Sequence, residues 1–361
     1  MRVMYVISTL ERCGPVNVLY GIAKGLRDRA EQAVVTIAAE PRDSRIGDFE
    51  ALGVPVSCAT STRLQSMLHG GKALERAVSE FHPDVINVHG FRATLLCRRA
   101  ALPKVVTLHN CIFDDFQTTY GGIQARLMEG LTVAAVRDYD AIVACSESNA
   151  ETLEERYALS PIPIRNGVDA DTFCPPTDTA RKNARRSLGI PDGSFAVVAT
   201  CGCSVRKRTL DVVRAFSDAS AHGVVLNILG EGPLYEECLK EAADGSVSLV
   251  GNRDDVPLWL SASDCFISMA SSEGLPMAAL EAASCGLPLV LSNIPPHREI
   301  AEILGSGVAL VESPVEAWNA IRKMAASGPS QRFAPPTDAL SSDRMARDYF
   351  ELFDSLLEDA L

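Results

Sequence analysis

The stretch Glu273-Gly-Leu-Pro-Met-Ala-Ala-Leu-Glu281, continued by Ala282-Ala-Ser-Cys-Gly286, places two carboxylates on either side of a seven-residue gap. Residues 274–276 predict a turn, and residues 277–285 predict a short helix that Gly286 ends. The N–H groups at a helix start have no partner within the helix and can hold an anion. One carboxylate can then accept hydrogen bonds from sugar hydroxyls while the other faces a second polar group. The pattern favours a sugar-nucleotide site, and the alternative is a solvated helix face.

Short apolar runs rich in β-branched residues recur along the chain, with helical stretches between them. This alternation is typical of parallel sheets that helices cover on both faces. After residues 14–15, apolar residues recur at helical spacing and predict an amphipathic helix. The expected strands are residues 2–7, 34–38, 84–88, 104–109 and 141–145 in the first half, and 196–201, 224–229, 247–250, 264–269, 288–292 and 308–311 in the second.

The length of 361 residues exceeds one ordinary hydrophobic core, so two domains are expected. Prolines and an Asn-Gly pair between residues 161 and 169 mark a connection. The predicted fold class is therefore α/β, with two Rossmann-like doubly wound domains over residues 1–163 and 164–340 and a cleft between them. Residues 341–361 show apolar residues at helical spacing, and this helix is expected to pack back on the first domain.

The charge balance excludes some partners. The chain carries 34 basic and 46 acidic residues, and its net charge of -12 argues against a nucleic acid or general adhesion to an anionic membrane. Two local basic clusters remain. The first is either ordinary surface or a contact for an anionic acceptor, and it comprises Arg92, Arg98, Arg99 and Lys104. The second is expected to be the solvated face of a linker helix, and it comprises Arg181, Lys182, Arg185 and Arg186.

The eleven cysteines are odd in number and lie mostly in apolar segments, which is typical of reduced core residues in a cytoplasmic protein. Cys201-Gly-Cys203 has no second Cys or His pair at zinc spacing nearby, so no metal is expected there. The apolar run at residues 1–7 suits a buried strand and is too short to cross a bilayer. We therefore expect no signal peptide and no spanning helix.

Four segments of the second half, in this order, resemble the retaining glycosyltransferases of family 4. They are Arg165-Asn-Gly-Val-Asp-Ala-Asp-Thr-Phe173, Gly230-Glu-Gly-Pro233, the segment between Val250 and Leu260, and the block at residues 273–286. The first half agrees more loosely, through residues 83–89, 106–109 and 140–146. The resemblance implies the GT-B architecture of two Rossmann-like domains. It also implies a hexosyltransferase that uses a nucleoside-diphosphate sugar as co-substrate and needs no cofactor.

The resemblance assigns roles in the second domain. The second carboxylate of the pair, here Glu281, holds the ribose hydroxyls in this family, and the first, here Glu273, faces the donor sugar. Asn252 and Arg253 are expected to line the base pocket through backbone contacts. The amides of Met277 and Ala278 then lie where the diphosphate would sit. The further residues expected to bind the donor are Arg206, Lys207, Gly274 and Leu275.

The sequence departs from the family pattern at the diphosphate. The family has a Gly followed by an Arg after the first strand of this domain, with a Lys a few residues on. Here Gly202 is followed by Cys203, which cannot supply that charge. The register of the following helix matches Lys207 to the family Lys, and Arg206 is the candidate for the missing guanidinium. The alternative is that Arg206 faces solvent.

The resemblance also assigns roles in the first domain. Gly14 matches the first residue of a Gly-Gly turn against the diphosphate, and Pro15 replaces the second. His109 matches a His that contacts the donor sugar and the reacting centre, and the alternative is a satisfied core histidine. His89 has the same strand-end position with less support. The implied catalytic residues are His109, Glu273 and Lys207, and the acceptor-side candidates are Arg92 and Asn110.

A metal-independent reaction is expected, because Lys207, Arg206 and the helix-start amides can stabilise the charge on the departing diphosphate. Asp138-Tyr-Asp140 has the spacing of a metal site, but it precedes a strand and so is expected at the edge away from the cleft. The resemblance further implies retention, with the acceptor hydroxyl attacking from the side of the leaving group.

Two other readings stay open from the sequence. One is a sugar-nucleotide epimerase on the same architecture, and the other is a non-catalytic sugar-nucleotide-binding relative. The residues do not distinguish a UDP-type from a GDP-type donor. The acceptor is equally open among a glycan, a lipid-linked sugar and a small glycoside, as is peripheral contact with a membrane.

Overall fold

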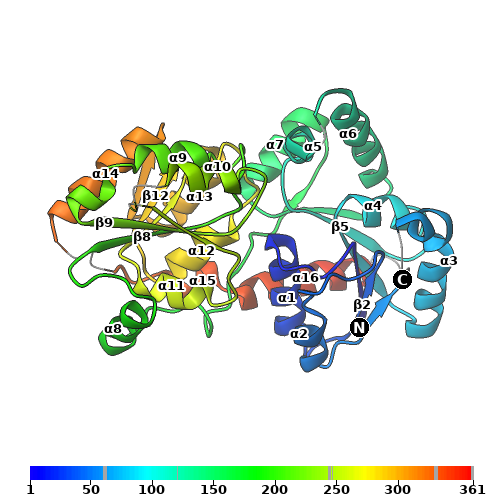
Figure 1. The fold of residues 1–361 in the computed structure, drawn as a ribbon. Helices are drawn as coiled ribbons and strands as arrows, with labels where there is room; N and C mark the ends of the chain where they lie inside the picture. Colours follow the sequence, from blue (N-terminus) through cyan, green and yellow to red (C-terminus); the bar gives the residue numbers. More distant parts are fainter. Residues whose placement is uncertain (60–62, 120, 243–244, 246, 329–331, 359–361) are drawn as a thin grey trace. The chain divides into compact units, whose positions relative to one another are not determined.

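The computed structural model describes residues 1–59, 63–119, 121–242, 245, 247–328 and 332–358. The chain divides into two compact units. The first unit holds Met1–Gly167 together with the residues from Ser341 onward, and the second holds Val168–Leu340. The expected domains meet between residues 163 and 164, whereas the units meet between Gly167 and Val168. Figure 1 shows the elements of both units.

The first unit is built on a parallel sheet that has, within the described residues, seven strands in the order β3-β2-β1-β4-β5-β6-β7. β1 pairs with both β2 and β4, so the order of strands reverses between β1 and β4. At such a switch point the loops after the strands diverge and leave room for a ligand. The strands are β1 (Arg2–Ile7), β2 (Glu31–Thr36), β3 (Val56–Cys58), β4 (Val85–His89), β5 (Lys104–Leu108), β6 (Ala141–Ala144) and β7 (Ile162–Pro163).

Two of these strands differ from the sequence-based expectation. β3 is short and has intermediate to exposed residues, so it lacks the apolar run that marks the others. β7 lies in the segment that we expected to be only a connection. Its Pro163 is tolerated because β7 is the last strand of the sheet, where an N–H is not needed for a further neighbour. The connection therefore begins after β7.

Successive residues of a strand face opposite sides of the sheet, and this separates the helices of the first unit into two layers. Val88 and Val106 pack with α4 and α6 in one apolar cluster. Thr107, the neighbour of Val106, instead reaches Tyr349 of α16. The helices are α1 (Gly14–Leu26), α2 (Ile46–Ala51), α3 (Arg63–Phe81), α4 (Phe91–Cys97), α5 (Ile112–Thr119), α6 (Gly122–Val136), α7 (Glu147–Tyr157) and α16 (Ser342–Glu358).

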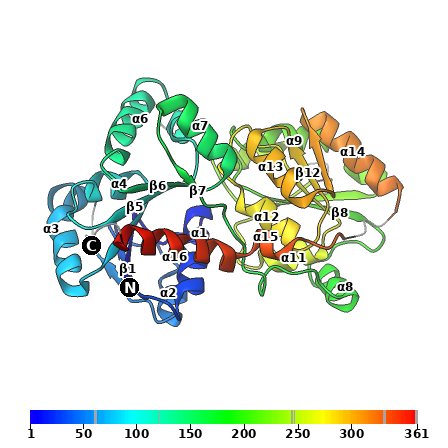
Figure 2. The same cartoon turned by 180° about the vertical axis from the view of Figure 1, so that it is seen from behind.

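The C-terminal helix α16 packs along α1, as Figure 2 shows. The two helices approach closely at Gly25, where an added Cβ would lie 2.4 Å from the Cβ of Ala346. Tyr349 and Phe353 of α16 are fully buried. α16 is thus part of the first unit although it follows the second in the sequence.

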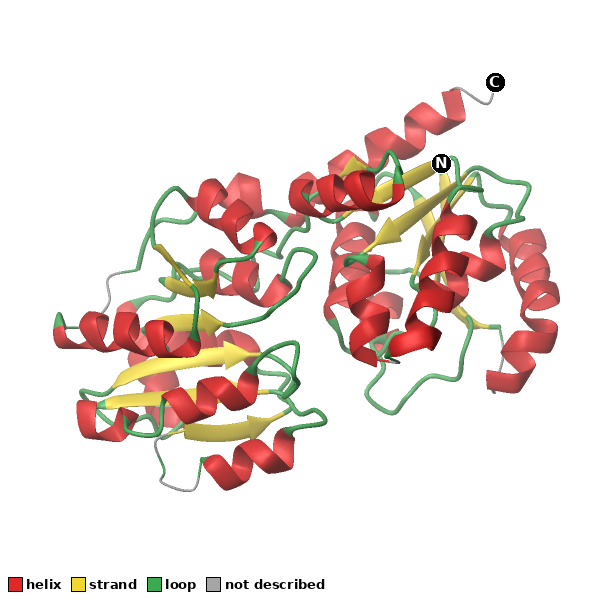
Figure 3. Cartoon of the chain, turned by 90° about the horizontal axis from the view of Figure 1, so that it is seen from above, coloured by secondary structure: helices red, strands yellow, loops and turns green. Residues whose placement is uncertain are grey.

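The second unit repeats the plan with a parallel sheet whose described strands have the order β10-β9-β8-β11-β12-β13. Figure 3 shows the strands and helices of the chain in different colours. β8 pairs with both β9 and β11, so the switch point lies between β8 and β11. The strands are β8 (Phe195–Thr200), β9 (Val224–Leu229), β10 (Val247–Gly251), β11 (Cys265–Ser268), β12 (Leu289–Ser292) and β13 (Val308–Val311).

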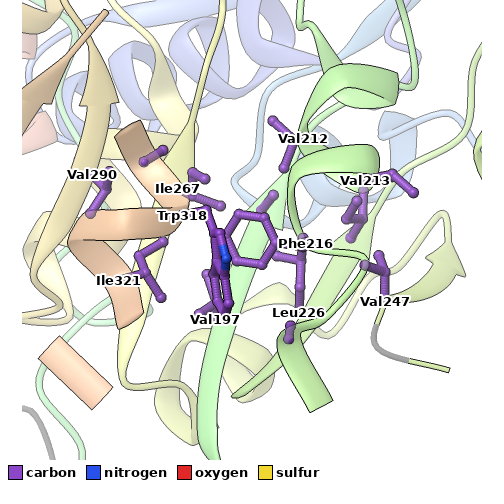
Figure 4. Close-up of a cluster of buried hydrophobic side chains, with 14 of the residues drawn as sticks. Val197, Val212, Val213, Phe216, Leu226, Val247, Ile267, Val290, Trp318 and Ile321 are labelled. Carbon is purple, nitrogen blue, oxygen red and sulfur yellow. The ribbon is translucent and has the colours of Figure 1, made fainter. Parts of the chain in front are cut away.

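One face of the second sheet carries the larger apolar cluster, shown in Figure 4. Phe216 and Trp318 lie at its centre, with their rings 4.9 Å apart. Ala184 and Ala262 pack with the opposite face. The helices are α8 (Asp178–Ser187), α9 (Thr209–Ala215), the 3-10 helix η1 (Ala219–His222), α10 (Tyr235–Glu241), α11 (Val256–Ala262), α12 (Met277–Ser284), α13 (Pro295–Leu304), α14 (Pro314–Ala326) and α15 (Thr337–Leu340).

The second basic cluster is not merely the solvated face that we expected. Arg181 of α8 forms an ion pair with Asp264, whose side chain is only 4% exposed. Arg185 approaches the other oxygen of Asp264 at 3.0 Å. The same carboxylate accepts the N–H of Ala196 at 2.8 Å. The two arginines therefore anchor α8 to the beginning of β8 and β11, a contact that the local sequence does not reveal.

Within the described part of the chain, no helix combines the length and the apolar character needed to cross a membrane. All eleven cysteines fall within the described residues, and none of them forms a disulfide. Most are buried, as expected for core residues.

Candidate active site

Two cations and one carboxylate meet at the carboxyl edge of the second sheet. Arg206 and Lys207 lie between β8 and α9, and Glu273 lies between β11 and α12. Lys207 Nζ pairs with Glu273 Oε1, and Arg206 Nη1 lies 3.0 Å from Oε2. The Glu273 side chain is only 8% exposed. The structure thus brings Glu273 to two neighbouring cations that lie more than 60 positions before it in the sequence, and Arg206 does not simply face solvent.

The charges of this group follow from its geometry. Burial alone raises the pKa of the Glu273 carboxyl, but Lys207 and Arg206 more than offset this and hold the pKa below its usual range. Glu273 is therefore an anion at neutral pH, and the three side chains together keep one net positive charge. The loops are also tied by backbone, because Ser271 N–H donates to Arg206 O at 2.8 Å. The result is a preorganised cationic site.

The start of α12 lies in the same unit and follows Glu273 directly. The first hydrogen bonds that close this helix run from Ala279 and Leu280 to Pro276 O, at 3.1 and 3.2 Å. The amides of Met277 and Ala278 precede them at the helix start. Gly286, with φ of +75°, follows the helix end. The turn and helix expected over residues 274–285 are confirmed within one residue.

Glu281 lies on α12 and is 7% exposed, so it is almost entirely buried in the second unit. Gly274 and Leu275 are buried in the turn before the helix. The side chain of Glu281 faces the interior of the unit rather than forming a solvated helix face. The alternative of a solvated helix face is therefore excluded for Glu281. Its role toward a ribose stays a prediction.

The Gly230-Glu-Gly232 turn lies against the loop that carries the cations. A Cβ on Gly230 would lie 2.4 Å from Cys201 O, and one on Gly232 would lie 2.5 Å from Cys203 O. Both are closer than atoms pack, so only glycine lets the turn rest on residues 201–203. Cys203 is fully buried, and burial raises the pKa of its thiol to about 12. Cys203 therefore fills space beneath the turn instead of carrying charge.

Asn252 and Arg253 follow β10, and both are exposed. Asn252 Oδ1 accepts the N–H of Glu231 at 3.1 Å and so ties the loop after β10 to the loop after β9. Arg253 instead pairs with Asp255 at 2.6 Å. Its guanidinium is held by its own turn, and a backbone contact between Arg253 and a base stays a prediction.

In the first unit, the predicted residues follow β1, β4 and β5, which are neighbours in the sheet. Gly14 begins α1, and Arg92 is exposed on α4. Asn110 is buried, and its Oδ1 accepts the N–H of Cys111 at 2.9 Å. His109 follows the last residue of β5 directly. All four therefore lie at the carboxyl edge of the first sheet.

The first basic cluster does not gather at one place. Lys104 begins β5, at the opposite edge of the sheet from Arg92, and its Nζ lies 3.7 Å from Asp140 Oδ2. Asp140 Oδ2 also accepts the Lys104 N–H at 2.9 Å. Asp140 thus supports the start of two strands, away from the carboxyl edge. Among the residues that the structure describes, no group of three or more His, Cys, Asp or Glu side chains is arranged to hold a metal ion.

His89 and His109 form a pair in the first unit. His89 Nδ1 lies 2.8 Å from His109 Nε2, and the rings are stacked with centroids 5.1 Å apart. Burial and the neighbouring His109 lower the pKa of His89 well below its usual value. Burial also lowers the pKa of His109 to about 4. Both rings are therefore neutral at neutral pH, and sequence reasoning weighed His89 too lightly.

A further histidine that sequence reasoning missed lies near the cations of the second unit. His297 of α13 is fully buried, and its Nδ1 lies 2.9 Å from Ser292 O. Burial lowers the pKa of His297 to about 4, while Glu273 acts to raise it and Lys207 to lower it. In the sequence, His297 is indicated only by its place on the helix that follows β12. The carboxyl end of β12 lies at the same edge of the sheet as the switch point.

Two family models match the chain. The model described as glycosyltransferase family 4 matches residues 13–172, and the model described as glycosyl transferases group 1 matches residues 195–327. This chain belongs to the family 4 glycosyltransferases. As a glycosyltransferase it is an enzyme, which sets aside the epimerase and the non-catalytic binding protein.

Curated relatives and a solved structure agree with this assignment. The chain is 23% identical to the O-antigen biosynthesis glycosyltransferase WclY of Escherichia coli, over 100% of both chains. It is 25% identical to an Escherichia coli UDP-Gal:alpha-D-GlcNAc-diphosphoundecaprenol alpha-1,3-galactosyltransferase, over 68% of this chain and 66% of that one. The crystal structure of Anabaena Alr3699/HepE in complex with UDP-glucose has a TM-score of 0.81 at 18% identity, over 98% of this chain and 100% of that one. The glycosyltransferase has the GT-B fold that the sequence predicted.

Proposed function

We propose that this glycosyltransferase moves a sugar from a nucleoside-diphosphate sugar to an acceptor hydroxyl, with retention of the anomeric configuration and without a metal ion. The observation that carries the proposal is the net positive charge that Arg206 and Lys207 keep beside the buried Glu273. It lies at the switch point of the second sheet, where ligands bind in doubly wound folds.

The chemistry requires stabilisation of a leaving group. As the anomeric C–O bond breaks, the nucleoside diphosphate gains negative charge. Lys207, Arg206 and the amides at the start of α12 offset this charge. The acceptor hydroxyl attacks from the side of the leaving group, and the departing phosphate oxygen takes its proton. No side chain then has to act as a strong base, which fits a site whose nearest carboxylate is already paired.

The remaining residues take supporting roles. Glu273 is ionised and accepts hydrogen bonds from the hydroxyls of the donor sugar. Glu281 holds the ribose, and His109 contacts the donor sugar from the first unit. Gly14 lets the backbone approach the diphosphate.

We favour UDP over GDP in the donor, because a relative is named for UDP-Gal and a structural neighbour was solved with UDP-glucose. The names of the relatives also favour a glycan or lipid-linked sugar as acceptor in polysaccharide biosynthesis. A small glycoside remains the alternative. A cytoplasmic enzyme with peripheral access to a membrane is consistent with such an acceptor.

Thermal-shift measurements with UDP, GDP and their sugars test the donor, because a ligand that binds the folded state raises the melting temperature. Donor turnover without an acceptor should then release nucleoside diphosphate slowly and leave the sugar unaltered. NMR of the glycoside formed should show the anomeric configuration of the donor. Turnover should persist after chelation and gel filtration; a loss that magnesium restores would overturn the metal-free reaction.

A further inference from the structure

A row of buried polar groups leads from α16 to His109 across the first sheet. Thr107 Oγ1 lies 3.0 Å from the hydroxyl of Tyr349 and accepts from Asn87 Nδ2 at 3.1 Å. Asn87 Oδ1 lies 2.7 Å from His89 Nε2. His89 Nδ1 in turn lies 2.8 Å from His109 Nε2. Asn87 and His89 are fully buried, so the contacts that Asn87 makes with Thr107 and His89 are shielded from water.

The direction of the hydrogen bonds that lead from Asn87 to His109 can be assigned from Asn87. Its amide nitrogen faces Val105 O at 3.5 Å, and a carbonyl oxygen can only accept. The Oδ1 of Asn87 therefore faces His89 Nε2, which must carry the hydrogen. A neutral imidazole has one N–H, so His89 Nδ1 is an acceptor. His109 Nε2 must then donate to it, which leaves His109 Nδ1 with a lone pair.

The charge state supports the same assignment. A protonated His89 would have an N–H on both nitrogens and would reverse the bond to His109. Burial makes that form unfavourable, because it lowers the pKa of both rings. At the other end of the row, burial raises the pKa of the Tyr349 phenol, so this group is uncharged at neutral pH. The Cys145 thiol donates to His109 O at 3.4 Å.

The outer nitrogen of His109 has a distinct position. Among the described residues, His109 Nδ1 is a buried side-chain nitrogen with no hydrogen-bond partner. A buried acceptor without a partner is costly, and this cost is relieved when a ligand donates to it. Sugar hydroxyls are donors of this kind.

We propose that Asn87 and His89 are positioning residues that hold His109 as its neutral Nε2–H tautomer, so that Nδ1 accepts a hydrogen bond from a hydroxyl of the donor sugar. This rests on the proposed function, in which His109 contacts that sugar. His109 then serves as an acceptor and not as an acid in the reaction. The fixed tautomer selects a hydroxyl over a ligand group that can only accept.

Histidine side-chain NMR, with one- and two-bond correlations between ring protons and ¹⁵N, reads the tautomers without any substrate. At neutral pH we expect the Nε2–H pattern for both His89 and His109, with the signals assigned from single His→Gln variants. An Nδ1–H pattern or a doubly protonated ring at either position would overturn the proposal.

Asn87→Leu removes the acceptor that orients His89 while nearly keeping the side-chain volume. We expect mixed tautomers at His109 and a fall in kcat of about tenfold with the cognate donor, the scale of one lost hydrogen bond. Thr94→Val is the matched control, because it removes a buried hydroxyl that, among the described residues, donates to Gly90 O of its own helix start and takes no part in the row. It should change neither the tautomers nor the rate.

The outcomes separate the two proposals. If Asn87→Leu shifts the tautomers but leaves kcat and KM unchanged, the positioning role is wrong while the proposed function stands. Should Asn87→Leu fail to fold, the tautomers are measured in Asn87→Ser instead. Its hydroxyl keeps an acceptor, so the Nε2–H pattern should be weaker than in wild type but still present. Wild-type protein that shows the expected tautomers but transfers sugar from no donor would overturn the proposed function and leave the tautomer assignment intact.

Discussion

The carboxyl edges of the two sheets have the same topology but opposite electrical character. In the second unit, the loops after β8 and β11 bring Arg206, Lys207 and Glu273 together as paired charges. In the first unit, the strand ends of β4 and β5 hold His89 and His109 as a neutral, hydrogen-bonded pair. The same fold plan, used twice in this chain, therefore supplies charged side chains at one switch point and uncharged hydrogen-bonding groups at the other.

This division of labour suits a reaction in which charge develops on one fragment only. The departing diphosphate becomes more negative, whereas the sugar hydroxyls remain neutral. Cations are therefore suited to the diphosphate, and neutral hydrogen-bond acceptors are suited to the sugar hydroxyls. If the comparison is right, removing charge from the second unit should slow chemistry, and perturbing the first should affect orientation and pH response.

The largest effect is expected from Lys207→Ala. We predict a fall in kcat of about 10²–10³-fold, similar to the loss of one preorganised donor at a developing negative charge. Initial rates at saturating donor measure it. Lys240→Ala, which removes an exposed lysine of α10 in the same unit, is the control and should leave kcat unchanged. Equal rates for Lys207→Ala and wild type would mean that this lysine does not contact the phosphates.

Glu281→Ala should act on donor binding. A hydrogen bond to a charged group contributes about 1.5–3 kcal/mol, so the loss of one such bond to a ribose hydroxyl should raise Kd for the nucleotide by about 10- to 100-fold. Isothermal titration calorimetry measures it. The Kd of Glu281→Gln, which keeps one acceptor oxygen, should lie between those of wild type and Glu281→Ala. A variant that loses kcat but binds nucleotide normally would reassign Glu281 to the reacting centre.

The histidine pair predicts a pH-dependent stability in the acid range. In the unfolded chain the usual histidine pKa is about 6.5, whereas the folded pKa of His109 is about 4. Between these values the unfolded state binds protons that the folded state excludes. Stability is therefore complete above the unfolded pKa and falls as the pH drops toward the folded pKa. The melting temperature should be lower at about pH 5 than at about pH 7.5.

The variant His109→Gln should reduce that difference in melting temperature, whereas His82→Gln, which replaces an exposed histidine of the same unit, should not. Differential scanning calorimetry at the two pH values gives both comparisons. An unchanged difference in His109→Gln would indicate that other groups set the acid sensitivity of the first unit.

The smallest effect is expected from Arg253→Ala. Its guanidinium pairs with Asp255 of its own turn and is exposed, and such surface pairs contribute little. We predict less than about a threefold change in Kd for the nucleotide, because only the backbone of this turn is expected at the base. A larger rise in Kd would show that the side chain leaves Asp255 to reach the ligand.

Much of this architecture was predictable because its signals are local. The apolar runs of β1, β9 and β13 match the expected strands, and the turn before α12 carries its own glycine and proline. The pairing of Glu273 with Lys207 was foreseeable only through the family resemblance. The sequence alone shows two charged residues far apart in the chain.

The rest depends on contacts between distant segments. Asn87 looks like an ordinary polar residue inside a strand, and nothing local indicates that its amide orients His89. The arginines of α8 look like a solvated face until Asp264 is placed beneath them. β3 and β7 were missed because they are short edge strands without an apolar run.

The central claim is that cationic side chains of the second unit bind the diphosphate of the donor. Calorimetric titration of a nucleoside and of its diphosphate, either uridine with UDP or guanosine with GDP, tests it most directly. We predict that wild type binds the diphosphate at least about 100-fold more tightly than the nucleoside, and that Arg206→Ala/Lys207→Ala loses most of this ratio while its affinity for the nucleoside is unchanged. A double variant that keeps the full ratio would contradict the account.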